Sequence, residues 1–270
     1  MIPLRALFLA ELRRCLSRRA VRLLVLLALV MIAITAGVAF VQTEPADMLR
    51  ADPHIARLAD LWHPDGDSVL SIAFVFLAIG ALIGGAVVVG GEWKAGTVTT
   101  TLLWESRRSR LLAMRLAACA ALSVVIGLAL LALLVAATLP TVLVKGETGE
   151  IDAAWAADLA GAVARGLGLA AFAATCGGAL ASLTRSTAGA LSAMFVYQAI
   201  GEPILRGLWP RRAGWFIGEN AVTFVAGHQL DDVPFGRSAY GASVVLTLYV
   251  LALGLAAAAL FARRDLAGTS

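Results

Sequence analysis

Six long apolar stretches dominate this 270-residue chain and limit the folds that are open to it. Each is close to the roughly 20 residues that a helix needs to cross the hydrocarbon core of a bilayer. Because backbone polar groups find no water there, each stretch must bond its N–H and C=O groups internally, as a helix does. The expected spans are 21–42, 68–91, 112–138, 160–183, 186–207 and 240–262. The sequence therefore predicts an all-α integral membrane protein with six transmembrane helices in one domain, 1–270.

The composition supports a chain whose solvent is partly lipid. Sixty per cent of the residues are hydrophobic and the mean hydropathy is +0.86, which a soluble domain of this size does not hide from water. The pI near 9.3 raises the question of nucleic acid binding. The basic residues flank the apolar stretches, however, where lipid head groups and membrane topology explain them. We expect membrane lipids, and no nucleic acid, as partners.

The arginines and lysines indicate the orientation. With the amino terminus inside, 14 of the 22 fall on the inner side, as the positive-inside rule requires. Both termini are then cytoplasmic. The chain has 20 arginines but only Lys94 and Lys145, a bias that favours a bacterial genome. We therefore expect a multi-pass protein of a bacterial plasma membrane.

Two segments outside the spans are also predicted to be helical. In residues 1–19 one arc of a helical wheel is apolar and the opposite side carries arginines, which is typical of a helix at the inner membrane interface. That arc holds Leu4, Phe8, Leu12, Cys15 and Leu16. The alternative is a frayed basic tail. The outer segment 208–239 mixes aromatic and charged residues, which indicates short extracellular helices before the last span.

The connector 91–111 is too long for a tight turn and too apolar for a plain solvated loop. Gly96 would end the helix before it, and Thr97 could cap a new one. Leu102, Leu103 and Trp104 would then form an apolar knob at the cytoplasmic face, suited to a groove on another protein. The alternative is an ordinary amphipathic inner loop.

The sequence of this connector resembles a known family. Residues 91–103 read Gly-Glu-Trp-Lys-x-Gly-Thr-x-Thr-Thr-x-Leu-Leu, and Ser-Arg-Arg-x-Arg follows. This pattern, together with the six-span layout and the basic amphipathic start, resembles the ABC-2 family of ATP-binding-cassette permeases. The resemblance implies a transport subunit that works as a homodimer or heterodimer and exports a substrate. It also implies that the connector is a cytoplasmic coupling helix held by a separate ABC ATPase.

The resemblance also implies site residues by position. The ATPase-coupling residues would be Glu92, Trp93, Lys94, Gly96, Thr97, Thr99, Thr100, Leu102, Leu103, Trp104, Arg107 and Arg108. ATP and Mg²⁺ would be bound by the partner subunit, and no cofactor by this chain.

The chain itself shows no pattern for catalysis. Gly91 and Gly96 have the spacing of a phosphate-binding loop, but Thr97 stands where that loop needs a lysine, and no strand precedes it. We therefore expect no enzyme activity and no catalytic residue. The three cysteines and three histidines are scattered, which predicts neither a disulfide framework nor a metal site.

Four polar residues in the apolar spans are candidates for a translocation path. They are Thr175, Tyr197, Gln198 and Glu202. Intramembrane ionisable groups are functional candidates, but Glu202 is also placed to pair with Arg206 one turn later. Polar residues of this kind also form bonds between helices. Gly80 and Gly84 form a Gly-x3-Gly pattern, which suggests a close helix contact, and Arg165 is expected to reach toward the outer surface.

Two other functional classes stay open from the sequence. An ATP-independent carrier or channel would need several essential buried ionisable residues. A non-transporting membrane anchor or immunity protein would tolerate disruption of the connector. The substrate is not determined by an Ala, Leu and Val-rich sequence.

Overall fold

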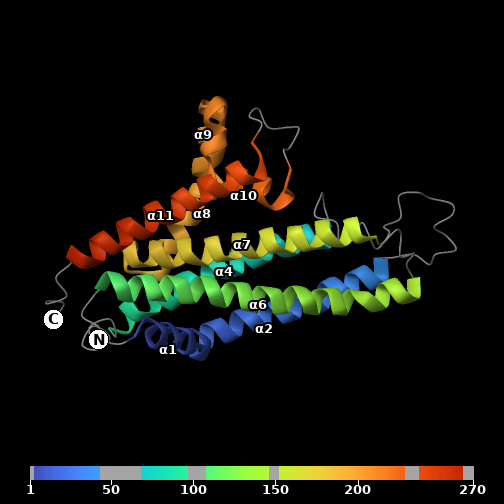
Figure 1. Ribbon diagram of the computed structural model, residues 1–270, viewed down its shortest axis with the longest axis horizontal. Helices are drawn as coiled ribbons and strands as arrows, with labels where there is room; N and C mark the ends of the chain where they lie inside the picture. The colour runs from blue at the N-terminus through green and yellow to red at the C-terminus, as the bar shows by residue number, and fades with distance from the viewer. Residues whose placement is uncertain (1–2, 43–67, 97–107, 146–151, 229–236, 264–270) are drawn as a thin grey trace.

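The computed structural model describes residues 3–42, 68–96, 108–145, 152–228 and 237–263, and every regular element in these ranges is a helix (Figure 1). The elements are α1 (Leu4–Ser17), α2 (Arg19–Gln42), α4 (Val69–Lys94), α6 (Arg108–Lys145), α7 (Ala153–Thr184), α8 (Thr187–Val196), the π-helix η1 (Tyr197–Gly201), α9 (Glu202–Leu208), the 3-10 helix η2 (Pro210–Trp215), α10 (Ile217–Ala226) and α11 (Ala239–Arg263). The predicted all-α class is therefore confirmed for the described part of the chain.

Five of the described helices are long and apolar enough to cross a membrane: α2, α4, α6, α7 and α11. Their outer faces are apolar, with Leu23 64% exposed and Leu255 70% exposed. Water would penalise such a surface at roughly 25 cal/mol for each Å², whereas lipid does not. The chain is thus a multi-pass membrane protein.

The predicted fifth span, 186–207, corresponds to residues 187–208, which are helical throughout but contain a π-bulge. The α-helix α8, the π-helix η1 and the α-helix α9 follow one another with helical backbone at each junction. Pro203 explains the bulge, because its ring excludes the carbonyl four residues earlier and it has no N–H. The N–H of Glu202 instead bonds the carbonyl of Tyr197, five residues back, as in a π-bulge. Beyond the bulge, α9 projects away from the long helices (Figure 1), and the six-span count is not reproduced.

The closest helix pair is α4 with α7, and two glycines allow it. A Cβ at Gly85 would lie 2.0 Å from the carbonyl oxygen of Ala174, and one at Gly177 would lie 2.1 Å from that of Leu82. The two backbones therefore touch. The close contact predicted at Gly80 and Gly84 is not seen among the described residues. A Cβ at Gly80 would meet nothing within 4 Å, and one at Gly84 would meet only the Leu24 side chain of α2, at 3.9 Å. The close contact uses the neighbouring face of α4.

The helix ends that flank the predicted connector gather at one end of the bundle. The C-terminal turns of α4, α7 and α11 meet the first turns of α6 and α8 in one apolar cluster. It contains Ala86, Val89, Leu112, Leu116, Ala179, Ala181, Ala190, Ala257 and Phe261. The helices α2 and α6 therefore begin at this end, whereas α4, α7 and α11 end there, and α1 lies at this same end (Figure 1).

The predicted amino-terminal helix is confirmed as α1, and its predicted apolar arc is buried in part. Cys15 is buried and Phe8 and Leu12 pack beside it, whereas Leu4 and Leu16 are about half exposed. The buried residues of α1 are Leu7, Glu11 and Cys15. These are spaced four residues apart and so share one helix face. This face turns inward because Glu11 forms an ion pair with Arg115 of α6. A helical wheel that considers only apolar residues does not include this interaction.

Short helices do precede the last long helix, as expected, in η2 and α10. The predicted coupling helix falls in 97–107, outside the described residues.

Candidate functional site

Five charged residues form an ion cluster at the end of the bundle next to the predicted connector. Its members are Glu11, Arg14, Arg18, Glu92 and Arg115, from α1, α4 and α6 and the junction between α1 and α2. Three are nearly inaccessible: Glu11 is 2%, Glu92 1% and Arg115 4% exposed. Charges rarely lie this deep unless they are paired.

Arg115 joins the two carboxylates. Its Nε donates to Glu11 Oε2 at 3.0 Å, its Nη2 donates to Glu11 Oε1 at 3.4 Å, and its Nη1 contacts Glu92 Oε2. The Glu11 contact is a two-pronged pairing that a planar guanidinium makes well. Glu92 Oε2 accepts no aligned hydrogen bond within the described residues, so its contact with Arg115 is mainly electrostatic.

Two more arginines complete the cluster from α1 and the turn that follows it. Arg18 Nη2 donates to Glu92 Oε1 at 2.9 Å, and Arg14 Nη1 donates to Glu11 Oε1 at 3.1 Å. Arg14 also lies 3.5 Å from Glu92 Oε1. Three cations therefore surround two anions, and α1 is attached to both helices that flank 97–107.

The local sequence explains why the cluster forms here. Glu92 lies in the last turn of α4, where the helix dipole disfavours an acid, so the carboxylate is stable only with cations beside it. Gly91 makes room for one of them, since a Cβ there would lie 2.8 Å from Arg18 Nη1. Arg18 itself has an extended backbone, which ends α1 and turns the chain into α2.

A pair of thiols lies against the same cluster. Cys15 of α1 and Cys119 of α6 are buried in one apolar group with Val21, Val88 and Ala118. The Cys119 thiol hydrogen-bonds to Cys15, and this bond lowers the pKa of the Cys15 thiol from its usual value. The contact is a further link between α1 and α6.

The predicted coupling residues separate into buried and exposed groups. Glu92 is buried in the ion cluster. Trp93 packs edge-on against Phe261 of α11, with ring centroids 5.9 Å apart, and the Arg185 guanidinium lies 5.4 Å from its ring centroid. Lys94 and Gly96 are exposed, and Gly96 has φ +67°, a left-handed conformation that suits a glycine ending a helix. Arg108 begins α6. The remaining coupling residues lie outside the described residues. They are Thr97, Thr99, Thr100, Leu102, Leu103, Trp104 and Arg107.

Sequence reasoning missed the partners of Glu92. From the sequence, only a role in membrane topology was inferred for the charged residues Glu11, Arg14, Arg18 and Arg115. One signal was available: Glu11 is an isolated acid among arginines in a segment with a pronounced basic excess, and such an acid invites pairing. Nothing in the sequence indicates that Arg115, on another helix, is the residue it meets.

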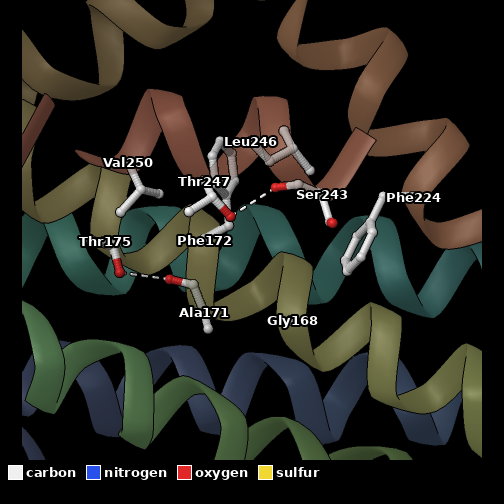
Figure 2. A pocket seen from close by; sticks show the side chains of 9 residues that line it. All are labelled: Gly168, Ala171, Phe172, Thr175, Phe224, Ser243, Leu246, Thr247 and Val250. Carbon is white, nitrogen blue, oxygen red and sulfur yellow. Dashed lines mark hydrogen bonds between the residues drawn. The ribbon is translucent and has the colours of Figure 1, made fainter. Parts of the chain in front are cut away.

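A hollow of about 360 Å³ opens between α7 and α11 (Figure 2). Its lining residues are Gly168, Ala171, Phe172, Thr175, Phe224, Ser243, Leu246, Thr247 and Val250. Figure 2 shows that its hydroxyls serve their own helices: Thr175 donates to the Ala171 carbonyl and Thr247 to the Ser243 carbonyl. The lining offered to a ligand is therefore mostly apolar.

The predicted path residues are only partly brought together. Thr175 lines the hollow, whereas Gln198 is exposed on η1. Tyr197 and Glu202 instead contact the first turn of α10. The Tyr197 hydroxyl accepts from the Ile217 N–H at 3.3 Å. The role of these four residues in transport stays a prediction.

Glu202 serves as an acceptor for the start of α10. Its Oε2 accepts from the Gly218 N–H at 3.0 Å and its Oε1 accepts from the Glu219 N–H at 3.2 Å. A carboxylate at this end of a helix satisfies unpaired N–H groups and complements the dipole. The expected partner Arg206 lies 3.6 Å from Glu202 and 2.5 Å from Glu219, so that pairing is confirmed.

Replacing Glu202 by alanine is expected to release α10 from η1 and α9. Two N–H groups of α10 lose their acceptor, a loss of about 1–2 kcal/mol of stability. The Glu202→Gln variant keeps a carbonyl oxygen and should lose less. Protease cleavage within 209–228 and the thermal midpoint of the purified protein measure both effects. Equal cleavage of Glu202→Ala and wild type would show that the carboxylate does not hold α10.

No protein-family model and no curated protein matches this chain.

Proposed function

We propose that the chain is the permease subunit of an ABC-2-type exporter. In this proposal a separate cytoplasmic ABC ATPase hydrolyses ATP, and a second permease copy completes the path across a bacterial plasma membrane with both termini inside. The sequence pattern in 91–115 suggests the family, and the five long apolar helices are compatible with it.

One observation supports the coupling role best: a buried ion cluster ties together the two helices on either side of the connector. Glu92 ends α4, Arg115 lies near the start of α6, and each has contacts with α1 or the turn after it. A push on 97–107 would therefore reach α1, α4 and α6 together. An unbraced connector would bend locally instead.

The proposed mechanism is mechanical. Closure of the two ATPase subunits around nucleotide would displace the connector, and the braced helix ends would move as one body. Because α4 touches α7 backbone to backbone, the motion would continue into α7, which borders the hollow shared with α11. Movement between α7 and α11 would then change access to that hollow.

Co-purification with an ATPase encoded by a neighbouring gene tests the proposal. The complex is expected to hydrolyse ATP, and replacing Leu102, Leu103 and Trp104 together by aspartate should weaken association at least tenfold. The reason is that buried apolar and aromatic anchors carry most of the energy of such contacts.

A control introduces two aspartates at the other end of α6. Leu143 and Val144 are 73% and 70% exposed there, and replacing both by aspartate should leave association unchanged. If neither the wild-type chain nor the control binds the ATPase, an ATP-independent carrier or an anchor is favoured. If the triple variant binds as tightly as wild type, the connector is not the docking element.

A further inference from the structure

Arg165 lies in the N-terminal half of α7, within a candidate membrane span, and has no acidic partner among the described residues. It lies 12 residues from the start of α7, which corresponds to about 18 Å along the helix axis. No carboxylate among the described residues forms a salt bridge with it. Charged residues inside membrane segments are costly and commonly serve a function.

Two glycines make room for the guanidinium. A Cβ at Gly227, the residue after α10, would lie 2.4 Å from Arg165 Nη2, and a Cβ at Gly161 would lie 3.2 Å from Nη1. Gly227 also has φ +83°, which favours glycine. Arg165 Nε donates to the Val225 carbonyl at 3.1 Å. The Nε thus holds the end of α10, and the two Nη groups make no hydrogen bond to another described residue.

The cation lies beside the apolar hollow. Gly168, one turn after Arg165 on α7, lines the hollow, and Phe224, the neighbour of Val225, forms its end. Figure 2 shows the Phe224 ring between α10 and Gly168, away from Val250 and Thr175. The site therefore combines an open apolar hollow between two candidate membrane helices with a cation on α7, one helical turn before the lining residue Gly168.

We propose that this hollow binds a single-chain amphiphile with a carboxylate head, such as a long-chain fatty acid anion. The chain would lie between Phe172 and Leu246, and the carboxylate would pair with the two Nη groups of Arg165. A guanidinium presents two parallel donors to the two oxygens of one carboxylate. The volume of about 360 Å³ lies at the small end of the roughly 300–1,000 Å³ of ligand sites, which suits one chain better than two.

The binding of a fatty acid anion in the hollow does not depend on the proposed function. The further step, that this ligand is the exported substrate, rests on the proposed function. Binding is measured without any ATPase, so failure of the exporter proposal leaves the result intact. Stimulation of the ATPase of the complex by the same probe would then link the two.

The test uses the purified full chain in detergent and two fluorescent probes with the same hydrocarbon chain, cis-parinaric acid and its uncharged methyl ester. The wild-type protein is expected to bind the acid about tenfold or more tightly than the ester, because a charge-assisted pair is lost in the ester. Equal affinities for the acid and the ester would overturn the proposal.

Three variants identify the site. Arg165→Gln keeps a donor for the Val225 carbonyl and should remove the preference for the acid while leaving ester affinity unchanged. Ala171→Phe fills the hollow and should weaken both probes at least tenfold. Ala252→Phe adds the same ring to an exposed position of α11 that does not line the hollow and should bind both probes like wild type.

Other outcomes contradict the proposal in distinct ways. Loss of both probes in Arg165→Gln would mean that Arg165 only holds α10 in place. Unchanged binding in Ala171→Phe would mean that the probes dissolve in the detergent belt or at another surface. Size-exclusion elution and helical circular dichroism equal to wild type are required of each variant, and Arg165→Lys, which keeps the charge, should retain part of the preference for the acid.

Discussion

Replacing Arg115 by methionine is expected to destabilise the protein by about 3–5 kcal/mol, because two carboxylates are left in a buried site without their shared cation. Methionine fills a similar volume, so the loss comes from charge and not from a cavity. Glu11 then keeps only Arg14, which is 41% exposed and so weakly held. The thermal midpoint of the purified protein measures the loss of stability, and trypsin cleavage after Arg13 and Arg14 reports the release of α1.

The matched control for this prediction is Arg13→Met. Arg13 is an exposed arginine on the same helix, and its replacement should change stability by no more than about 0.5 kcal/mol. Arg115→Lys should fall between the two, because it keeps the charge but not the planar pairing with Glu11. If Arg115→Met melts with wild type and α1 stays protected, the ion cluster does not hold α1 to the bundle.

A second way to test the cluster is to remove all of its buried charges. Buried ion pairs are often no more stable than well-packed neutral residues of the same size. Combining Arg115→Met with Glu11→Gln and Glu92→Gln should therefore restore much of the stability that Arg115→Met alone loses. If the restored protein still binds an ATPase but no longer couples hydrolysis to transport, the charges serve coupling and not only folding.

Replacing Gly177 by alanine is expected to push α7 away from α4. The new methyl group would lie 2.1 Å from the Leu82 carbonyl oxygen, and a backbone atom, unlike a flexible side chain, cannot turn aside. Overpacking of this kind costs about 1–3 kcal/mol. Gly85→Ala is expected to do the same against Ala174. Thermal unfolding in the same detergent measures each loss.

The control is Gly80→Ala on α4, the helix that also carries Gly85. A Cβ there meets nothing within 4 Å among the described residues, so alanine should be neutral or stabilising by up to about 1 kcal/mol through its higher helix propensity. A destabilised Gly80→Ala with an unaffected Gly177→Ala would mean that α4 packs through its Gly80 and Gly84 face, contrary to the structure.

The sequence by itself determined the membrane class and most of the helices. Length and hydropathy are sufficient for this, because lipid enforces internal hydrogen bonding on any apolar segment of about 20 residues. Five expected spans have counterparts in α2, α4, α6, α7 and α11. The sequence also contains the reason for the π-bulge in 187–208, Pro203, but a proline does not give the direction in which a helix bends.

Only the tertiary structure decided which residues meet. Arg115 and Glu11 are 104 residues apart, and nothing local to either identifies the other. Whether Gly84 or Gly85 contacts α7 depends on which face of α4 turns toward α7. The hydrophobic periodicity of α4 does not determine this rotation, because every face of an apolar helix is equally compatible with lipid. The same holds for Arg165 and the hollow beside it, which exist only because α7, α10 and α11 converge there. Hydropathy determines which segments lie in lipid. The pairing of charges and the close contacts at glycines determine which helices pack against one another.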